Sequence, residues 1–183
     1  MEPVTRSFRN HVVCLAIVLG GMLPFPSLAA DDSLEYQVKA AFLLNFTKFI
    51  EWPEMAFAGS DSPIAICILG NDPFGGALDR LVEGESVSGR KVTVQRIKRA
   101  PSSKSCQVLF AGASEKDALK LLPVLGTGVL TVGEGDTFAR DGGMIAFVIE
   151  NRRVRFEINQ TVAETAGLKL SARLLNVAKS VEK

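Results

Sequence analysis

The sequence is poor in the residue on which many enzyme mechanisms depend. Its one histidine, His11, lies in an N-terminal segment that has the layout of an export signal. Without histidine, a Ser-His-Asp or Cys-His mechanism has no general base, and sites in which histidine binds zinc or copper are excluded. Hydrolases that use paired carboxylates or a lysine base such as Lys48 remain open, but no spacing indicates them. We therefore expect a protein that is not an enzyme and that needs no metal or cofactor.

The sequence also lacks an apolar run long enough to span a bilayer. The apolar run at residues 12–23 has about a dozen residues, whereas a membrane helix needs roughly 20. Arg6 and Arg9 precede this run, and the small residues 27–29 follow it, as in a secretory signal peptide. We predict a signal peptide over residues 1–29, export to the periplasm and no direct insertion into the membrane.

An excess of charge of either sign is absent as well. Removal of Glu2, Arg6 and Arg9 with the leader leaves 19 basic and 19 acidic residues. A balance of this kind does not indicate a nucleic-acid partner. The remaining residues, 30–183, are of the length of one ordinary domain with a core of its own.

Only two cysteines, Cys67 and Cys106, follow the leader. In an oxidising compartment such a pair is most simply a structural disulfide, with a redox-active pair or two unpaired thiols as alternatives. Both cysteines lie in predicted strands, and a bridge is attainable if those strands are neighbours. The spacing is too long for the C-x-x-C arrangement that lowers a thiol pKa.

Strand patterns alternate with helix patterns over most of the chain. We predict strands at residues 63–70, 90–97, 106–112 and 128–133, and helices at 33–52, 72–82 and 114–122. Asp72 is the expected N-cap of the second helix, with Pro73 in its first position. Such alternation favours a mostly parallel sheet that helices cover on both faces.

The C-terminal part has a different pattern. Residues 143–150 and 153–159 predict an antiparallel hairpin with a tight turn. Asn159 can cap a short helix that ends at Gly167, and apolar residues at 170–177 suggest a last helix. The predicted fold is a three-layer α/β sandwich with a mostly parallel sheet, an antiparallel C-terminal hairpin at its edge and a long N-terminal helix.

The turn "LGNDPFGG" follows a predicted strand and precedes a helix, which is where open α/β sheets bind ligands. Asn71, Asp72, Phe74 and Gly75 are the candidate ligand residues, and a plain capping turn is the alternative. "GEGDTFARDGGM" could hold a cation through Glu134, Asp136 and Asp141, but its spacing does not match a calcium loop, so we expect a rim loop.

A second candidate lies on the last predicted strand, "RRVRFEIN". Alternation along a strand places four polar residues on one face: Arg153, Arg155, Glu157 and Asn159. A solvated face explains this pattern, and a polar patch that contacts a partner is the alternative.

The first predicted helix is apolar over about half of its circumference, whereas an ordinary surface helix needs a stripe of about 100°. Asn45 falls inside this arc. We expect part of the arc to pack on the sheet and the rest to contact a partner or a second copy. The candidate interface residues are Phe42, Leu43, Phe46, Phe49, Ile50 and Trp52.

Several blocks of the sequence resemble the YfiR family of periplasmic proteins. These are "YQVKAAFLLNFTKFIEWP", "ICILGNDPFG", "CQVLF", "VLTVGEGDTFARDGGMIAFVIENRRVRFEIN" and "AGLKLSARLLNVAK", which together cover nearly all of the chain after the leader. The resemblance implies an α/β domain, a bridge between Cys67 and Cys106, and a homodimer. Some members of the family have a second cysteine pair, which this chain lacks.

The resemblance further implies a regulator that binds the periplasmic part of an inner-membrane diguanylate cyclase and represses it. Cyclic di-GMP and biofilm formation would then be restrained, and an outer-membrane peptidoglycan-associated lipoprotein would relieve the repression. The alternative that the residues leave open is a periplasmic small-molecule binding module that serves a sensor kinase or a transporter.

Overall fold

The computed structural model describes residues 28–101, 104–115 and 118–183. The predicted signal peptide, residues 1–29, lies outside these residues except for its last two positions. Those two positions are the first residues of helix α1. Cleavage near Ala29 or Ala30 therefore stays a prediction.

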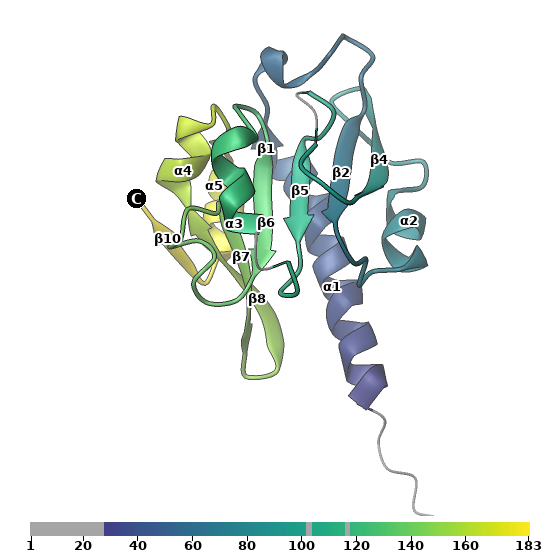
Figure 1. The fold of residues 1–183 in the computed structure, drawn as a ribbon, viewed down its shortest axis with the longest axis vertical. Helices are drawn as coiled ribbons and strands as arrows, with labels where there is room; N and C mark the ends of the chain where they lie inside the picture. Colours follow the sequence, from purple (N-terminus) through teal and green to yellow (C-terminus); the bar gives the residue numbers. More distant parts are fainter. Residues whose placement is uncertain (1–27, 102–103, 116–117) are drawn as a thin grey trace, which may run out of the picture.

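The described residues form an α/β fold in which helices and strands are mixed along the chain (Figure 1). The helices are α1 (Leu28–Phe49), α2 (Gly76–Val82), α3 (Ala118–Leu121), α4 (Gln160–Thr165) and α5 (Ala172–Val177), with 3-10 turns η1 (Glu54–Ala56) and η2 (Leu122–Val124). The strands are β1 (Ile50–Glu51), β2 (Ile64–Leu69), β3 (Ser86–Val87), β4 (Arg90–Ile97), β5 (Val108–Ala111), β6 (Leu130–Glu134), β7 (Ile145–Glu150), β8 (Arg153–Asn159), β9 (Lys169–Leu170) and β10 (Ser180–Glu182).

The main sheet confirms the predicted mixture of parallel and antiparallel strands. Its strand order is β10-β8-β7-β6-β5-β2-β4-β3. The pairs from β4 to β7 are parallel, and the β7–β8 hairpin is antiparallel. Two short strands, β3 and β10, extend the sheet at its ends, and the sequence pattern did not predict them.

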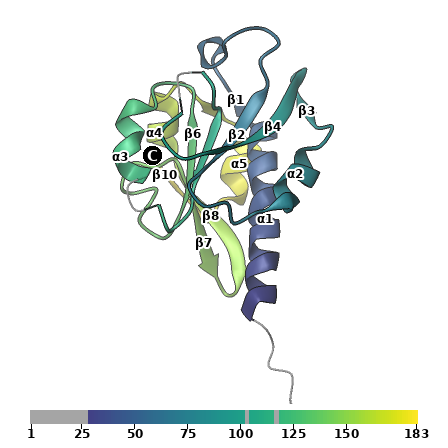
Figure 2. The same cartoon turned by 45° about the vertical axis from the view of Figure 1, so that its right-hand side comes forward.

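Helices lie on both faces of the sheet, as Figure 2 shows. On one face α1, α2 and α5 pack against strand side chains such as Ile66, Phe110 and Ile145. On the other face α3 and the chain that follows it pack against Cys67 and Leu109. β2 is buried along its whole length because its alternate side chains enter these two cores.

Helix α1 ends three residues earlier than the sequence predicts. Ile50 and Glu51 leave the helix and pair with Leu170 and Lys169 as a two-stranded antiparallel sheet. Ser171 N–H donates to the carbonyl of Phe49 at 2.9 Å, which satisfies one of the last helical acceptors. A tertiary strand pair therefore ends the helix before Pro53 would.

The start of α2 also differs from the prediction. Asp72 Oδ1 accepts hydrogen bonds from the backbone of Phe74 and Gly75, and the helix begins only at Gly76. Asp72 thus closes an Asx turn ahead of the helix and is not its N-cap, and Pro73 is not helical.

The C-terminal expectations agree more closely with the structure. The two residues of the hairpin turn, Asn151 and Arg152, have φ angles of 50° and 60°, as a two-residue type I′ turn requires. Asn159 Oδ1 accepts from the N–H of Val162 at 3.0 Å and so caps α4, as predicted. The last helix is shorter than predicted, because Lys169–Leu170 forms β9.

Cys67 and Cys106 are joined by a disulfide, which confirms the predicted bridge. Cys67 lies in β2 and Cys106 just ahead of the neighbouring strand β5, with 6.0 Å between their Cα atoms. This separation lies in the usual range for a disulfide. Both side chains are buried in the core on the α3 side of the sheet.

Candidate functional site

The aromatic helix face that the sequence singled out divides into core and partly exposed residues. Leu43, Phe46 and Ile50 are buried in the main core. Phe42, Phe49 and Trp52 are half-buried and pack against the same core. The indole N–H of Trp52 donates to the carbonyl of Gln107 at 3.2 Å, so its polar atom faces the protein. Half of the six predicted interface residues are therefore core residues in the folded chain.

Phe42 and Phe46 join α1 to the hairpin through aromatic packing. The ring of Phe46 lies 5.9 Å from that of Phe147 and 5.2 Å from that of Phe156. Phe42 contacts the same two rings at 6.1 and 5.3 Å. Aromatic pairs in this range stabilise by about 0.5–1.5 kcal/mol beyond the area that they bury. Much of the wide apolar arc thus fixes the hairpin to the first helix.

The exposed apolar part of α1 lies nearer the N-terminus than the aromatic run. Leu34 is 59% exposed and Val38 is 37% exposed. Across from them on the hairpin, Ile149 is 53% exposed. Together with Phe42 and Val154 they line a groove of about 400 Å³ between α1 and the hairpin. The sequence analysis did not identify Leu34 and Ile149 as interface residues. Their apolar side chains, on the helix face and near the hairpin turn, could have indicated an exposed apolar surface.

A buried lysine is the other feature that sequence reasoning missed. The ammonium group of Lys39 pairs with Glu35 one turn earlier and with Glu134 at the end of β6. Glu134 Oε2 also accepts from the N–H of Ala113 at 2.8 Å, and the hydroxyl of Tyr36 lies 3.4 Å away. A buried charge is tolerated only when it is paired and hydrogen-bonded, as here. The cluster of Glu35, Tyr36, Lys39 and Glu134 therefore holds α1 against the ends of β5 and β6.

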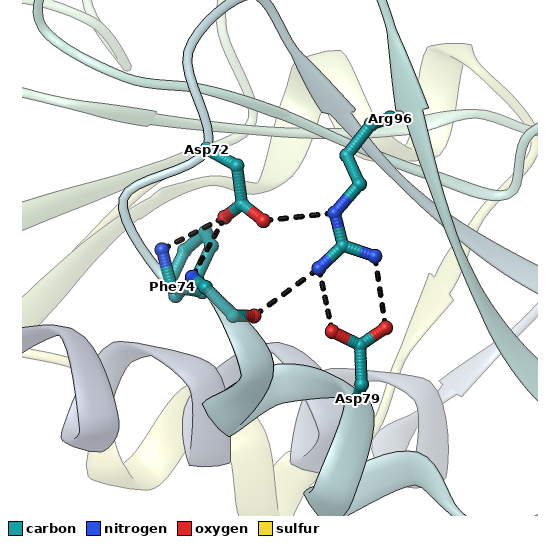
Figure 3. Close-up of polar contacts among 5 residues, drawn as sticks. Asp72, Phe74, Asp79 and Arg96 are labelled. Atoms are coloured by element: carbon teal, nitrogen blue, oxygen red, sulfur yellow. Dashed lines mark hydrogen bonds and ion pairs between the residues drawn. The ribbon is translucent and has the colours of Figure 1, made fainter.

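The predicted ligand turn is closed by an arginine from the neighbouring strand (Figure 3). Arg96 on β4 donates from Nε to Asp72 Oδ2 at 2.8 Å and from Nη2 to the carbonyl of Gly75 at 3.1 Å. Nη1 and Nη2 also donate to the two carboxylate oxygens of Asp79 on α2, at 2.8 and 2.6 Å. The fork of the guanidinium suits such bidentate pairing.

This pairing changes the protonation behaviour of the turn. The hydrogen bonds from Arg96 hold the pKa of Asp79 below its ordinary value, and the pKa of Arg96 is raised by the same contacts. The N–H groups of Phe74 and Gly75, which an anion would need, donate instead to Asp72. Asn71 is exposed beside the turn. The turn thus joins β2, β4 and α2 through its own residues.

The four residues of the predicted polar patch lie in different surroundings. Arg153 is exposed at the hairpin turn and Arg155 is half-buried. Glu157 pairs with Lys179 at 3.0 Å, and this hydrogen bond raises the pKa of Lys179. Asn159 is buried, where it caps α4 and donates from Nδ2 to the carbonyl of Ala139 at 3.1 Å. A partner could reach Arg153, whereas Asn159 holds the fold.

Within the described residues, no group of three or more histidine, cysteine, aspartate or glutamate side chains is placed to hold a metal ion. In the loop "GEGDTFARDGGM", Glu134 belongs to the buried cluster with Lys39. The carbonyl of Asp136 accepts two hydrogen bonds from Arg140 in the same loop. None of the helices in the described ranges has both the length and the apolar character that a membrane crossing requires.

Two solved structures are similar to this chain at 11% sequence identity. One is a conserved domain protein from Vibrio cholerae, with a TM-score of 0.50, and the other is an ABC domain in complex with L-Trp from Streptococcus pneumonia, with a TM-score of 0.46. In both comparisons 80% of this chain is covered, but only 60% of the other chain. These likenesses concern the fold alone. No curated protein sequence matches the chain.

The sequence itself matches a family. Residues 36–179 fit the sequence model of the YfiR/HmsC-like family. The match begins at Tyr36 in α1, ends at Lys179 and contains the disulfide, the hairpin and most of the groove. It covers most of the 183 residues, so the chain belongs to the YfiR/HmsC-like family.

Proposed function

We propose that the protein is a periplasmic, non-enzymatic regulator that binds the periplasmic part of an inner-membrane diguanylate cyclase and represses it. Membership of the YfiR/HmsC-like family carries this proposal, because that family suggests regulation of diguanylate cyclase signalling. Repression keeps cyclic di-GMP low and restrains biofilm formation. An outer-membrane peptidoglycan-associated lipoprotein relieves the repression, and the regulator acts as a homodimer.

The exposed apolar surface supports a function that depends on protein contact. Leu34, Val38 and Ile149 lie around one groove and are not scattered singly over the surface. Contiguous exposed apolar side chains commonly mark a protein-binding site. Arg153 beside them gives this surface a polar rim, which is the usual anatomy of an interface that forms and dissociates.

Binding represses the cyclase if the regulator prefers its inactive conformation. A ligand shifts a conformational equilibrium only by its difference in affinity for the two states. A hundredfold preference corresponds to about 2.8 kcal/mol, which a few well-packed apolar side chains can supply. The regulator then needs no chemistry of its own.

The proposal is tested by deletion of the gene in its host. We expect cyclic di-GMP and surface attachment to rise, and expression of the exported protein from a plasmid to restore both. The membrane cyclase should co-purify with the tagged wild-type protein. Unchanged cyclic di-GMP together with no co-purifying cyclase would refute the proposed function.

A small-molecule binding module for a sensor kinase or a transporter is the second candidate. One observation favours it: a largely apolar pocket of about 320 Å³, whose lining includes Leu125, Val129, Met144 and Val162. This volume is at the lower end of the range for small-ligand sites. A ligand held at 100 times its Kd would stabilise the protein by about 2.7 kcal/mol, so a thermal-shift screen of metabolites is the test. No shift across the library would count against this function.

A further inference from the structure

The outer half of the β7–β8 hairpin has an apolar pair that is only partly covered, on the face that packs against α1. Phe147 and Phe156 lie opposite each other in the hairpin, and the rings of Phe42 and Phe46 cover them. The next pair on this face is Ile149 and Val154, which α1 leaves half-covered or exposed. In Figure 1 the hairpin extends past the ends of the other strands, beside the first turns of α1.

The first helix forms the second wall of this space. Leu34, Val38 and Phe42 are spaced four residues apart, so they lie on one side of α1 and face the groove. They extend over about 12 Å of helix, which is a little more than two turns. The apolar floor is therefore long enough for a short helix, and the sheet and α1 shape it before any partner binds.

The charges at the groove are unequal. Arg153 lies at its hairpin end, and its side chain is exposed. Among the described residues that line the groove, Glu35 is the acidic one, and it is paired with the buried Lys39. The groove thus offers a cationic rim, and carboxylates on a partner would complement it.

We propose that this groove binds an amphipathic α-helix from the periplasmic part of the repressed cyclase, with its apolar side chains over Val38 and Ile149 and its carboxylates near Arg153. The inference rests on the proposed function and names the surface through which that function acts. On this face of the sheet the covering layer consists of helices, and a partner helix beside α1 completes that layer over the hairpin.

The test places a charge in the apolar floor. Val38→Glu and Ile149→Glu are compared with Val124→Glu, since Val124 is an equally apolar residue that is 70% exposed on η2, outside the groove. The probe is the host cyclase that co-purifies with the full-length exported protein. We expect each groove variant to bind at least about thirtyfold more weakly, as for the loss of an interface hot spot, and Val124→Glu to bind as the wild type. Circular dichroism shows whether each variant is folded.

A photo-crosslinking amino acid at position 38 keeps the proposal testable if a glutamate variant fails to fold. We expect a crosslink from that position to an acidic helical segment of the cyclase, and none from position 124. If the wild type binds the cyclase and the folded groove variants bind equally well, this inference is wrong while the proposed function stands. If the groove variants lose only self-association, the occupant is a second copy and the inference is wrong. If the wild type binds no cyclase, both fall.

Discussion

Lys39 on α1 and Glu134 at the end of β6 form an ion pair in which the two side chains are only 5% and 7% exposed. They lie 95 residues apart in the chain, and the pair joins the first helix to the sheet. Lys39 lies one turn from Glu35 and one residue after Val38, so it also fixes the side of α1 that faces the groove. The buried charge and the exposed apolar surface thus depend on one placement of the helix.

Replacement of Lys39 by alanine should destabilise the protein strongly. The change leaves the carboxylate of Glu134 buried without its cation, and breaking a buried ion pair in this way costs about 3–5 kcal/mol. Urea unfolding measures the change in the free energy of unfolding. The matched control is Lys48→Ala, because Lys48 pairs with Glu85 at the surface and should contribute at most about 1 kcal/mol.

The double variant Lys39→Met with Glu134→Leu tests the physical reason. Replacement of both charges by apolar side chains of similar size removes the uncompensated carboxylate, so most of the lost stability should return. Equal losses in the single and double variants would show that packing of the lysine stem, and not the buried charge, causes the effect.

Reduction of the disulfide should lower stability without changing the fold. The bridge joins residues 39 apart, and in the chain-entropy model it contributes up to about 4 kcal/mol. Urea unfolding with and without a reductant measures this difference, and Cys67→Ser with Cys106→Ser repeats it without a reductant. A reduced protein with the same unfolding midpoint would contradict the structural role.

Substitution of Asn159 by alanine removes the N-cap of α4. We expect a loss of about 1 kcal/mol from the cap, and a further loss because the carbonyl of Ala139 no longer receives a buried hydrogen bond. Arg153→Ala, at the exposed start of the same strand, is the control and should leave stability nearly unchanged. Thermal unfolding of the two variants shows whether the buried end of β8, at Asn159, contributes more to stability than the exposed end, at Arg153.

The Asp79–Arg96 pair predicts a specific dependence of stability on pH. The pKa of Asp79 is lowered in the folded protein, chiefly by its hydrogen bonds from Arg96. A lowered pKa stabilises the fold above the ordinary aspartate value of about 4, and this contribution is lost as the pH falls through the folded-state pKa. The wild type should therefore have a larger free energy of unfolding than Asp79→Asn at neutral pH. This difference in the free energy of unfolding should become smaller in acid. Urea unfolding over a pH series decides this, and a difference that does not change with pH would refute it.

Local patterns predicted the parts of the fold that local physics determines. The apolar run of β2, the hairpin turn at Asn151 and Arg152, and the cap at Asn159 all follow from short stretches of sequence. The end of α1 could not be predicted in this way, because Ile50 pairs with Leu170, a residue 120 positions away. β10 was missed for a similar reason, since three residues form a strand only beside β8.

At the candidate site, too, short stretches of sequence predict some features, whereas others depend on residues far away in the chain. Helical periodicity placed Asn45 in the apolar arc, but its side chain is exposed. The polar side chain of Thr47, two residues later, is buried instead and donates to the carbonyl of Leu44. In the sequence, Lys39 has the pattern of an ordinary surface residue. In the folded chain it is buried, because Glu134 at the end of β6 lies beside it and pairs with it. A helix that packs against strands, a hairpin and two other helices has no single polar side, so its partners decide which residues are exposed.

Repression of the cyclase by contact is best measured as cyclase activity with purified components. The host cyclase is reconstituted in proteoliposomes with its periplasmic part accessible, and synthesis of cyclic di-GMP from GTP is followed as the purified regulator is added. We expect synthesis to fall as the concentration of the wild-type regulator rises, and not to fall when Ile149→Glu is added instead. An unchanged rate at a regulator concentration that saturates binding would contradict repression by contact.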